Sequence, residues 1–290
     1  MEYKCELNEY GFYQRTPLPT DEELREFYES KYYQDSLSIT YEKKYSDIDL
    51  DFINLSLMQK EYAIHRSGIY KGGILDIGCG EGYVLKYFFQ KGWEVLGIDF
   101  SEYGIKTHNQ DMMDFFIQGN IFEVIEDLIF DKKEFDIINI DCVLEHVLNP
   151  EKLIILCKKI LKKNGRIIVK VPNDFNVLQN YMYENHIIDR KKWICYDHIS
   201  YFTPDGLKNI FYKNGFKCDV ILGDQIIEVF ALNTNTNYYC NSDVGKSCHY
   251  ARIHFEKILT TISLEKRFEL CKALGELGLG RELIGIFYIR

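Results

Sequence analysis

The sequence predicts an α/β fold, with a doubly wound and mostly parallel sheet that helices cover on both faces. Short, continuously apolar segments alternate with helical segments from about residue 73 onward. Strands that are apolar on both of their faces are typical of a parallel sheet buried between two helical layers. Apolar residues make up 46% of the 290 residues, which is enough for a full core.

The individual elements follow from this alternation. The expected strands lie at 74–77, 95–98, 115–117, 137–140, 167–171, 218–222 and 283–289. The expected helices lie at 83–90, 102–108, 121–130, 150–161 and 204–213. Gly92 and Gly165 stand where the C-terminal glycines of helices belong, and Pro150 stands at a favourable first helical position.

The chain is expected to divide into an N-terminal helical preface or lid, residues 1–70, and a main domain, residues 71–290. Thr20 and Glu23 form a capping-box pattern that predicts a helix to about Ser30, and a second helix is expected over Phe52–Arg66. Residues 173–202 interrupt the alternation with an aromatic, histidine-bearing insertion. Residues 232–280 form a second insertion before the last strand, and its helical part is expected either to cover the sheet edge or to make a homodimer contact.

Charge and cysteine usage exclude several classes of protein. The net charge is −9 and there is no basic run, which argues against nucleic acid as the partner. The nine cysteines are scattered without a Cys-x-x-Cys pair, so we expect free thiols and a cytoplasmic location. No apolar stretch is long enough to span a bilayer, and no cysteine and histidine spacing matches a common zinc site.

A glycine loop between two acids carries the first functional signal. Asp76 precedes Gly78-x-Gly80-x-Gly82, and Asp99 ends the next apolar segment. In a parallel sheet this places both carboxylates at the carboxyl edge, with the loop between them. Carboxylates beside a pyrophosphate repel it by roughly 1 kcal/mol or more per close pair. They suit the ammonium and sulfonium of S-adenosylmethionine, and Asp99 suits ribose hydroxyls. A dinucleotide-binding dehydrogenase remains the weaker alternative, because Asp99 would serve either cofactor.

These motifs resemble those of the class I S-adenosylmethionine-dependent methyltransferases, in the small-molecule branch found with sugar and surface-polysaccharide biosynthesis. The resemblance covers about residues 70–220 and the last strand. Its parts are Leu75–Gly82, Gly97–Ser101, Gln118–Ile121, Phe135–Val147 and Pro150–Pro172. It implies a Rossmann-like sheet of seven strands whose last strand is antiparallel and inserted beside the sixth.

The resemblance also implies the cofactor, S-adenosyl-L-methionine, with S-adenosyl-L-homocysteine as product. Asn120 stands where the family commonly has Asp facing the adenine, so it departs from the family pattern. Phe100 is expected near the adenine or in the core. The full set of expected cofactor contacts is Asp76, Gly78, Gly80, Asp99, Phe100, Asn120 and Asp141.

Two histidines are the candidate catalytic residues. Methyl transfer from a sulfonium is an in-line displacement, so the enzyme supplies alignment and, for a hydroxyl acceptor, a general base. His146 follows the fourth strand beside Glu145, and His198 lies in the 173–202 insertion, so both are expected at the same mouth of the sheet. His198 is preferred as the base. The expected acceptor-binding residues are Trp193, Tyr196, Asp197 and Tyr201.

Three readings of the acceptor and activity remain. The preferred one is O-methylation of a small molecule, a nucleotide sugar or capsule or surface-polysaccharide precursor, to which Asp197-His198 and its aromatic neighbours are similar. The second is O-methylation of a quinone or other aromatic hydroxyl, to which the Glu145-His146-Val147 loop is similar. The third is a non-catalytic module that keeps the fold. Nucleobase methylation is disfavoured because the family's two prolines are missing after Asp141, and no metal is expected.

Overall fold

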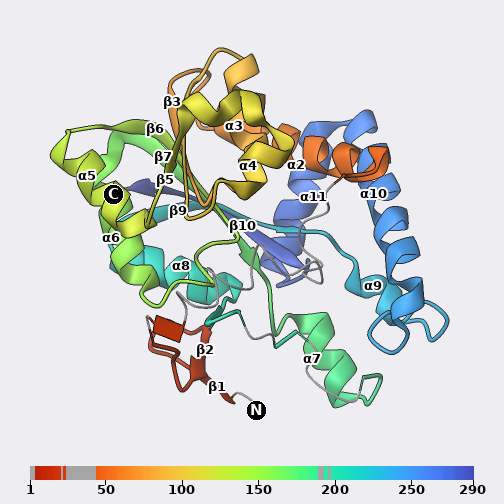
Figure 1. Ribbon diagram of the computed structural model, residues 1–290. Coiled ribbons are helices and arrows are strands. Elements are labelled where there is room, and N and C mark those ends of the chain that lie inside the picture. Colours follow the sequence, from red (N-terminus) through yellow and green to blue (C-terminus); the bar gives the residue numbers. More distant parts are fainter. Residues whose placement is uncertain (1–3, 21, 24–43, 189–192, 195–196) are drawn as a thin grey trace.

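A seven-stranded sheet forms the centre of the protein (Figure 1). The computed structural model describes residues 4–20, 22–23, 44–188, 193–194 and 197–290. Across the sheet the strands are β5 (Phe116–Gln118), β4 (Glu94–Asp99), β3 (Gly73–Ile77), β6 (Phe135–Asp141), β7 (Leu161–Pro172), β10 (Glu282–Ile289) and β9 (Phe216–Asp224). The last strand, β10, is antiparallel to both of its neighbours, while the pairs from β5 to β7 are parallel. The predicted fold class, including an antiparallel last strand beside the sixth, is therefore confirmed.

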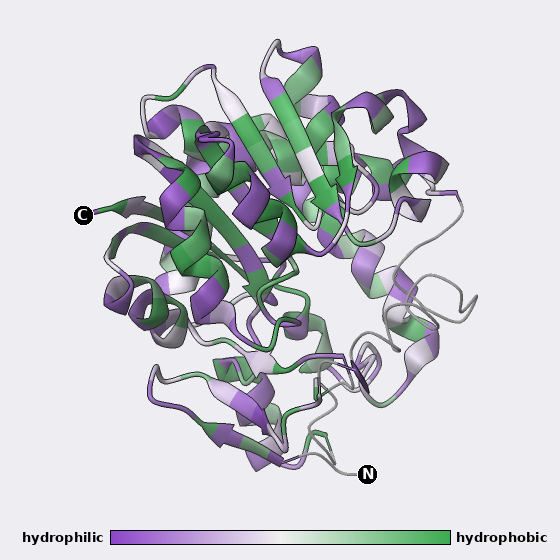
Figure 2. Ribbon diagram, turned by 60° about the vertical axis from the view of Figure 1, so that its left-hand side comes forward, coloured by the Kyte–Doolittle hydropathy of each residue, from purple (hydrophilic) through white to green (hydrophobic). Residues whose placement is uncertain are grey.

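Helices cover both faces of this sheet, as predicted. One face is covered by α2 (Asp47–Arg66), α3 (Tyr83–Gln90), α4 (Tyr103–His108) and α11 (Leu264–Glu276). The other face is covered by α5 (Ile121–Phe130), α6 (Pro150–Ile160) and α8 (Pro204–Lys213). Hydrophobic colouring dominates the strands, whereas the helices carry both colours because one side of each faces water (Figure 2).

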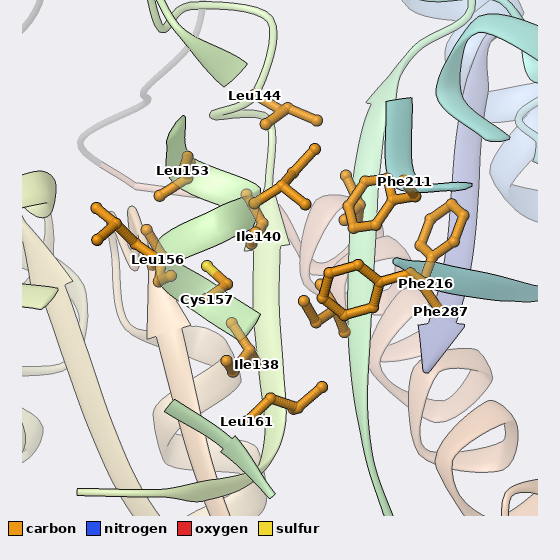
Figure 3. Packing of buried hydrophobic residues seen from close by; sticks show 14 of the residues in the cluster. Ile138, Ile140, Leu144, Leu153, Leu156, Cys157, Leu161, Phe211, Phe216 and Phe287 are labelled. Carbon is orange, nitrogen blue, oxygen red and sulfur yellow. The ribbon is translucent and has the colours of Figure 1, made fainter. Parts of the chain in front are cut away.

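Two large apolar clusters, one per face, hold the helices on the sheet. In the cluster under α6 and α8, Ile138 and Ile140 of β6 lie beside Leu156 and Cys157 of α6 (Figure 3). On the other side of that cluster the rings of Phe211 and Phe287 stack, with their centroids 3.8 Å apart. Side chains this deeply buried stabilise the fold by about 1.5–3 kcal/mol each, so the sheet is a rigid platform for its carboxyl edge.

The N-terminal preface contains a helix, as predicted, and also a hairpin that the sequence did not indicate. Ser46 and Asp49 cap α2 reciprocally, so this helix begins five residues before its predicted start at Phe52. The hairpin consists of β1 (Lys4–Leu7) and β2 (Tyr13–Thr16), and it pairs with β8 (Ser200–Tyr201). The Thr20–Glu23 capping box is present, but most of the helix expected to follow it lies outside the described residues.

The two insertions add helices around the carboxyl end of β7. The first contains α7 (Val177–Glu184), which the sequence did not predict, and β8. The second contains α9 (Glu228–Ala231), the short η3 (Ser242–Val244) and α10 (Gly245–Ile262), and α10 packs on α2 and α11. Elsewhere in the chain, the 3-10 helix η2 (Gln110–Phe115) precedes β5. The hairpin and α7 lie together where β7 ends (Figure 1). A third apolar cluster holds this layer: Phe175, Met182, Ile188, Trp193, Tyr201 and Ala231.

Sheet topology places the site. The chain runs outward from β3 through β4 to β5 and then returns to β6 on the other side of β3. Ligands of open α/β sheets bind at the carboxyl ends of the strands beside such a reversal, here between β3 and β6. Among the residues described, no helix is both long and apolar enough to cross a membrane.

Candidate active site

The glycine loop between β3 and α3 is a tight backbone turn. Gly78, Gly80 and Gly82 all have positive φ angles, of 70°, 50° and 75°. A Cβ atom on Gly78 would lie 2.2 Å from Cγ2 of Val143 in the loop after β6. Glycine is therefore required both for the backbone conformation and for the close approach of the two loops. The amides of Gly78, Cys79, Gly80 and Gly82 all donate hydrogen bonds within the protein, so this turn is held in a fixed shape at the start of α3.

Asp99 fastens this loop to the end of β4. Its Oδ2 accepts a hydrogen bond from the Gly80 amide at 2.9 Å, and its Oδ1 accepts one from the Ser101 amide at 3.0 Å. The side chain is buried. Each carboxylate oxygen has two lone pairs and can accept more than one hydrogen bond, so Asp99 is suited to accept from the vicinal hydroxyls of a ribose as well. This arrangement fits the expected role of Asp99.

Phe100 and Asn120 lie beyond Asp99. Phe100 is 41% exposed, so it is a surface aromatic and not a core residue. Asn120 is exposed and caps α5, where its Oδ1 accepts a hydrogen bond from the Phe122 amide at 2.9 Å. Its amide NH2 group remains a donor. The position of Asn120 is explained by its capping of α5, and Phe100 is a surface residue. The contacts of both with an adenine stay predictions.

A buried polar chain joins the ends of β3 and β6 to helix α2. Lys60 of α2 donates to Oδ1 of Asn139 at 2.6 Å and to Oδ2 of Asp141 at 2.5 Å. Asn139 donates in turn to Oδ1 of Asp76 at 2.6 Å. We missed Lys60 and Asn139 in the sequence. Asn139 left a signal, a polar residue inside an otherwise apolar strand; Lys60 left none, because it contacts the strand from a distant helix.

The electrostatics of this chain favour a cationic ligand. Burial raises the pKa of Asp76 to about 7, and the nearby charge of Asp141 adds to the rise. Burial also acts to raise the pKa of Asp141, but the charges of Lys60 and Lys170 outweigh it, so that pKa is lowered. Oδ1 of Asp141 is buried and accepts no hydrogen bond within the described part of the chain. An unpartnered buried oxygen of one carboxylate, with a second carboxylate nearby, is where an ammonium group fits.

A second cluster lies in the loop after β6 and contains both candidate histidines. The rings of His146 and His198 are 4.9 Å apart and nearly perpendicular. The amides of Ile199 and Ser200 donate to the carbonyl of Glu145 at 2.8 and 3.0 Å, and this pairing brings the 173–202 insertion against the β6 loop. The structure thus brings together the two histidines that the sequence placed at one mouth of the sheet.

Polar neighbours orient each histidine. Nδ1 of His146 lies 2.9 Å from the carbonyl oxygen of Asp197, so that nitrogen carries the proton and donates. Nδ1 of His198 lies 3.4 Å from Oδ2 of Asp174. Asp174 is 1% exposed, and its Oδ1 faces Arg281 at 3.3 Å. The contact of His146 is a hydrogen bond and that of His198 is a longer electrostatic contact, and both set the orientation of the ring.

Burial sets the protonation of this second cluster. It lowers the pKa of His146 to about 4, with the neighbouring His198 contributing, so His146 is neutral at pH 7. Burial raises the pKa of Glu145 to about 8. Ligand atoms of Glu145, His146 and His198 lie within 4.8 Å of one another, so these three side chains could hold a metal ion. The expectation that they hold none stays a prediction.

The expected acceptor-binding residues are placed at different depths. Tyr201 is fully buried and its ring centroid lies 5.9 Å from that of His198. Trp193 is also buried, and its ring centroid lies 5.7 Å from that of Phe175. Asp197 contributes its backbone carbonyl to His146. Tyr196 lies outside the described residues, and the acceptor role of all four stays a prediction.

Comparison with known proteins identifies the family. Residues 61–220 match a family described as a methyltransferase domain. The chain belongs to this family and is an S-adenosylmethionine-dependent methyltransferase, so S-adenosylmethionine is its cofactor. The dehydrogenase alternative is thereby excluded.

Individual relatives are more distant. The chain is 26% identical over 198 residues to a ubiquinone biosynthesis O-methyltransferase of Glaesserella parasuis, a match covering 64% of this chain and 80% of that protein. It is 26% identical over 190 residues to the mitochondrial protein of the same name from Bos taurus, covering 61% of this chain but only half of that protein. The crystal structure of the plantazolicin methyltransferase BamL is similar with a TM-score of 0.51 and 17% identity, over 82% of this chain and 85% of that one. That similarity concerns the fold alone.

Proposed function

We propose that the protein transfers the methyl group of S-adenosylmethionine to a hydroxyl group of a small molecule, with His198 as the general base. One observation carries the proposal: the loop after β6 connects Asp141, which belongs to the buried polar chain at the ends of β3 and β6, to His146. The ring of His146 lies 4.9 Å from that of His198. A methyl donor bound at the first position could then point its methyl group at a hydroxyl bound at the second, as in-line displacement requires.

Residues of strands β3, β4 and β6 would hold the cofactor. When bound, it supplies a methyl group on a sulfonium, which has a good leaving group. Asp76 and Asp141 would receive its ammonium, and the loop containing Gly78 and Gly80 would lie along its tail. Asp99 would accept the ribose hydroxyls. Phe100 and Asn120 would flank the adenine.

The histidines would orient the acceptor hydroxyl and accept its proton. His198, held by Asp174, accepts the hydroxyl proton as the oxygen attacks, and the buried carboxylate stabilises the resulting imidazolium. His146 is neutral because of its lowered pKa, and its hydrogen bond to the Asp197 carbonyl fixes the ring. It is therefore suited to orient the acceptor oxygen toward His198.

Two acceptor classes are supported by different observations. The Asp197-His198 segment with its aromatic neighbours supports a nucleotide sugar or surface-polysaccharide precursor, which is our first candidate. The names of the relatives support a phenolic or quinone-type hydroxyl instead. At 26% identity such a name does not determine an acceptor, so this class is our second candidate.

An S-adenosylhomocysteine release assay across nucleotide sugars, simple phenols and quinone analogues tests the proposal. We expect turnover with a member of the first set, reduced at least 100-fold in His198→Ala. His254→Ala, an exposed histidine of α10, is the matched control and should retain full activity. Turnover of phenols alone would replace the first acceptor class with the second. A His198→Ala variant as fast as the wild type would refute the assignment of the base.

A further inference from the structure

An ion pair between β7 and β10 belongs neither to the polar chain around Asp141 nor to the histidine cluster. Nζ of Lys170 lies 3.7 Å from Oε2 of Glu282, and the two side chains are 21% and 20% exposed. Lys170 and Glu282 are each two residues from a residue of the apolar cluster under α2 and α11, Ile168 and Ile284. Side chains alternate along a strand, so both members of the pair lie on that face of the sheet.

The pair lies next to both halves of the candidate site. Lys170 is opposite Asp141 in the parallel pairing of β6 and β7. Burial is the main cause of the raised pKa of Glu145 in the loop after β6, and the nearby charges of Asp174 and Glu282 add to the rise. One end of the pair is therefore beside the residues proposed to hold the cofactor, and the other is beside those that surround the proposed base.

The hydrogen-bonding capacity of the pair is unused. Among the residues that the structure describes, neither the ammonium of Lys170 nor the carboxylate of Glu282 makes a side-chain hydrogen bond, and 3.7 Å is too long for one between them. An ammonium group offers three donors and a carboxylate about four acceptor positions. A partly buried ion pair without hydrogen bonds loses hydration with little gain, so it is a poor device for stabilising the fold.

The charges of the pair favour a neutral ligand that both donates and accepts hydrogen bonds. Burial acts to lower the pKa of Lys170, but the surrounding negative charges, first that of Glu282, outweigh it and raise this pKa well above its ordinary value. A phosphate bound by Lys170 would be repelled by Glu282, and an amine bound by Glu282 would be repelled by Lys170. A hydroxyl group is repelled by neither, because it has one donor and two acceptor lone pairs.

We propose that Lys170 and Glu282 bind two adjacent hydroxyl groups of the acceptor, which makes the acceptor a sugar ring and not a simple phenol. This inference rests on the proposed function, which places a third hydroxyl of the same ring at His198. One hydroxyl accepts from the ammonium and its neighbour donates to the carboxylate. A phenol bound at His198 has no further hydroxyl and would leave both charges partly desolvated. A hydrogen bond to a charged group is worth about a 10- to 100-fold change in affinity.

Calorimetric titration of the full chain, loaded with S-adenosylhomocysteine, tests the inference. The probes are UDP-glucose, UDP-galactose and GDP-mannose, followed by the monodeoxy analogues of whichever binds most tightly. Glu282→Gln and Lys170→Met should each weaken binding of that sugar about 10-fold or more. Lys152→Met is the matched control, because Lys152 forms an exposed ion pair with Glu126 at 3.1 Å and should leave the affinity unchanged.

The deoxy analogues separate a direct contact from a structural role. The analogue that lacks the hydroxyl held by Lys170 should bind the wild type about 10-fold more weakly than the parent sugar. Lys170→Met should then cost no further affinity for that analogue, because the contact is already missing. Equal losses in Lys170→Met for the parent sugar and for every analogue would show a structural role and overturn the inference.

Other outcomes would also overturn it. A nucleoside diphosphate that binds as tightly as its sugar, and is weakened equally by Lys170→Met, would make the pair an anion site. A phenol that binds as tightly as the sugars would remove the need for adjacent hydroxyls. Should Lys170→Met not fold, Glu282→Gln provides the same comparison. Binding of S-adenosylhomocysteine without binding of any of the three sugars would refute this inference alone, whereas failure to bind S-adenosylhomocysteine would refute the proposed function.

Discussion

His198 and Asp174 form a buried pair whose nearest atoms, Nδ1 and Oδ2, are 3.4 Å apart. Asp174 follows β7, and its other oxygen lies 3.3 Å from the guanidinium of Arg281, which precedes β10. Two adjacent strands of the rigid sheet thus position one carboxylate against the imidazole. A carboxylate held in this way fixes the orientation of the ring and favours its protonated form during proton transfer.

Replacing Asp174 with Asn should reduce kcat about 10-fold or more, because the amide keeps the shape but no longer stabilises the imidazolium. The affinity for S-adenosylmethionine should be unchanged. The pH profile of kcat should shift to lower pH, and steady-state kinetics from pH 5 to 9 measure both effects. A lower affinity for the cofactor with an unchanged pH profile would indicate a purely structural role.

Asp174→Asn removes a negative charge 3.4 Å from His198, and a nearby carboxylate favours the protonated imidazole. Its loss should therefore lower the pKa of His198, so the acidic limb of the kcat profile should move to lower pH. An acidic limb that stays in place would contradict the assignment of His198 as the base.

Glu145 should make the protein less stable as the pH rises. Burial raises the pKa of its folded-state carboxyl to about 8, above the ordinary value of 4.5, so the folded protein holds a proton that the unfolded chain releases. Stability is then lost between about pH 4.5 and 8, and each tenfold change in proton affinity is worth about 1.4 kcal/mol. Glu145→Gln should flatten this dependence in urea unfolding at pH 5 and pH 8. A wild type that is equally stable at both values, with no difference from the variant, would contradict it.

Gly78→Ala should destabilise the glycine loop by about 1–3 kcal/mol, because φ is +70° and the added Cβ would lie 2.2 Å from Cγ2 of Val143. Thermal unfolding measures the loss. Adding Val143→Ala should recover the part due to the clash and leave the part due to the backbone. A double variant no more stable than Gly78→Ala would show that the clash contributes nothing.

Methyl transfer should not depend on a divalent metal ion. A metal bound by Glu145, His146 and His198 would occupy the imidazole nitrogen that accepts the proton. Activity measured after dialysis against a chelator should equal that of the untreated protein. A loss of activity that Mg²⁺ or Zn²⁺ restores would make the histidines ligands and would replace the base with a Lewis acid.

The sequence was sufficient for the sheet and for most of its helices. The strands are short apolar runs bounded by glycine, proline and acidic residues, all of which are local features of the sequence. The helices α3, α5 and α8 end at the residues predicted from the same kind of local feature. It was not sufficient for the hairpin of β1 and β2, because its third strand, β8, lies almost 200 residues further along the chain. Pairing between such distant segments leaves no periodicity in either of them.

The candidate site was also predicted only in part, because local motifs were recognised and contacts between distant segments were not. The glycine loop and Asp99 belong to one local motif, and the structure joins them by the bond from the Gly80 amide. Lys60 was missed because its environment is created by strand β6, 79 residues away. Asp174 was not predicted to support a histidine, since the sequence does not reveal that β7 and β10 place it between His198 and Arg281.

Calorimetric titration with S-adenosylmethionine tests the central claim most directly, that the carboxyl edge of β3 and β4 binds the cofactor. We predict that the wild type binds one equivalent and that Asp99→Ala binds at least 10-fold more weakly, because the ribose hydroxyls lose a buried charged acceptor. Asp131→Ala, an exposed acid at the end of α5, should bind like the wild type. No binding by the wild type, or undiminished binding by Asp99→Ala, would contradict the account and favour a non-catalytic module.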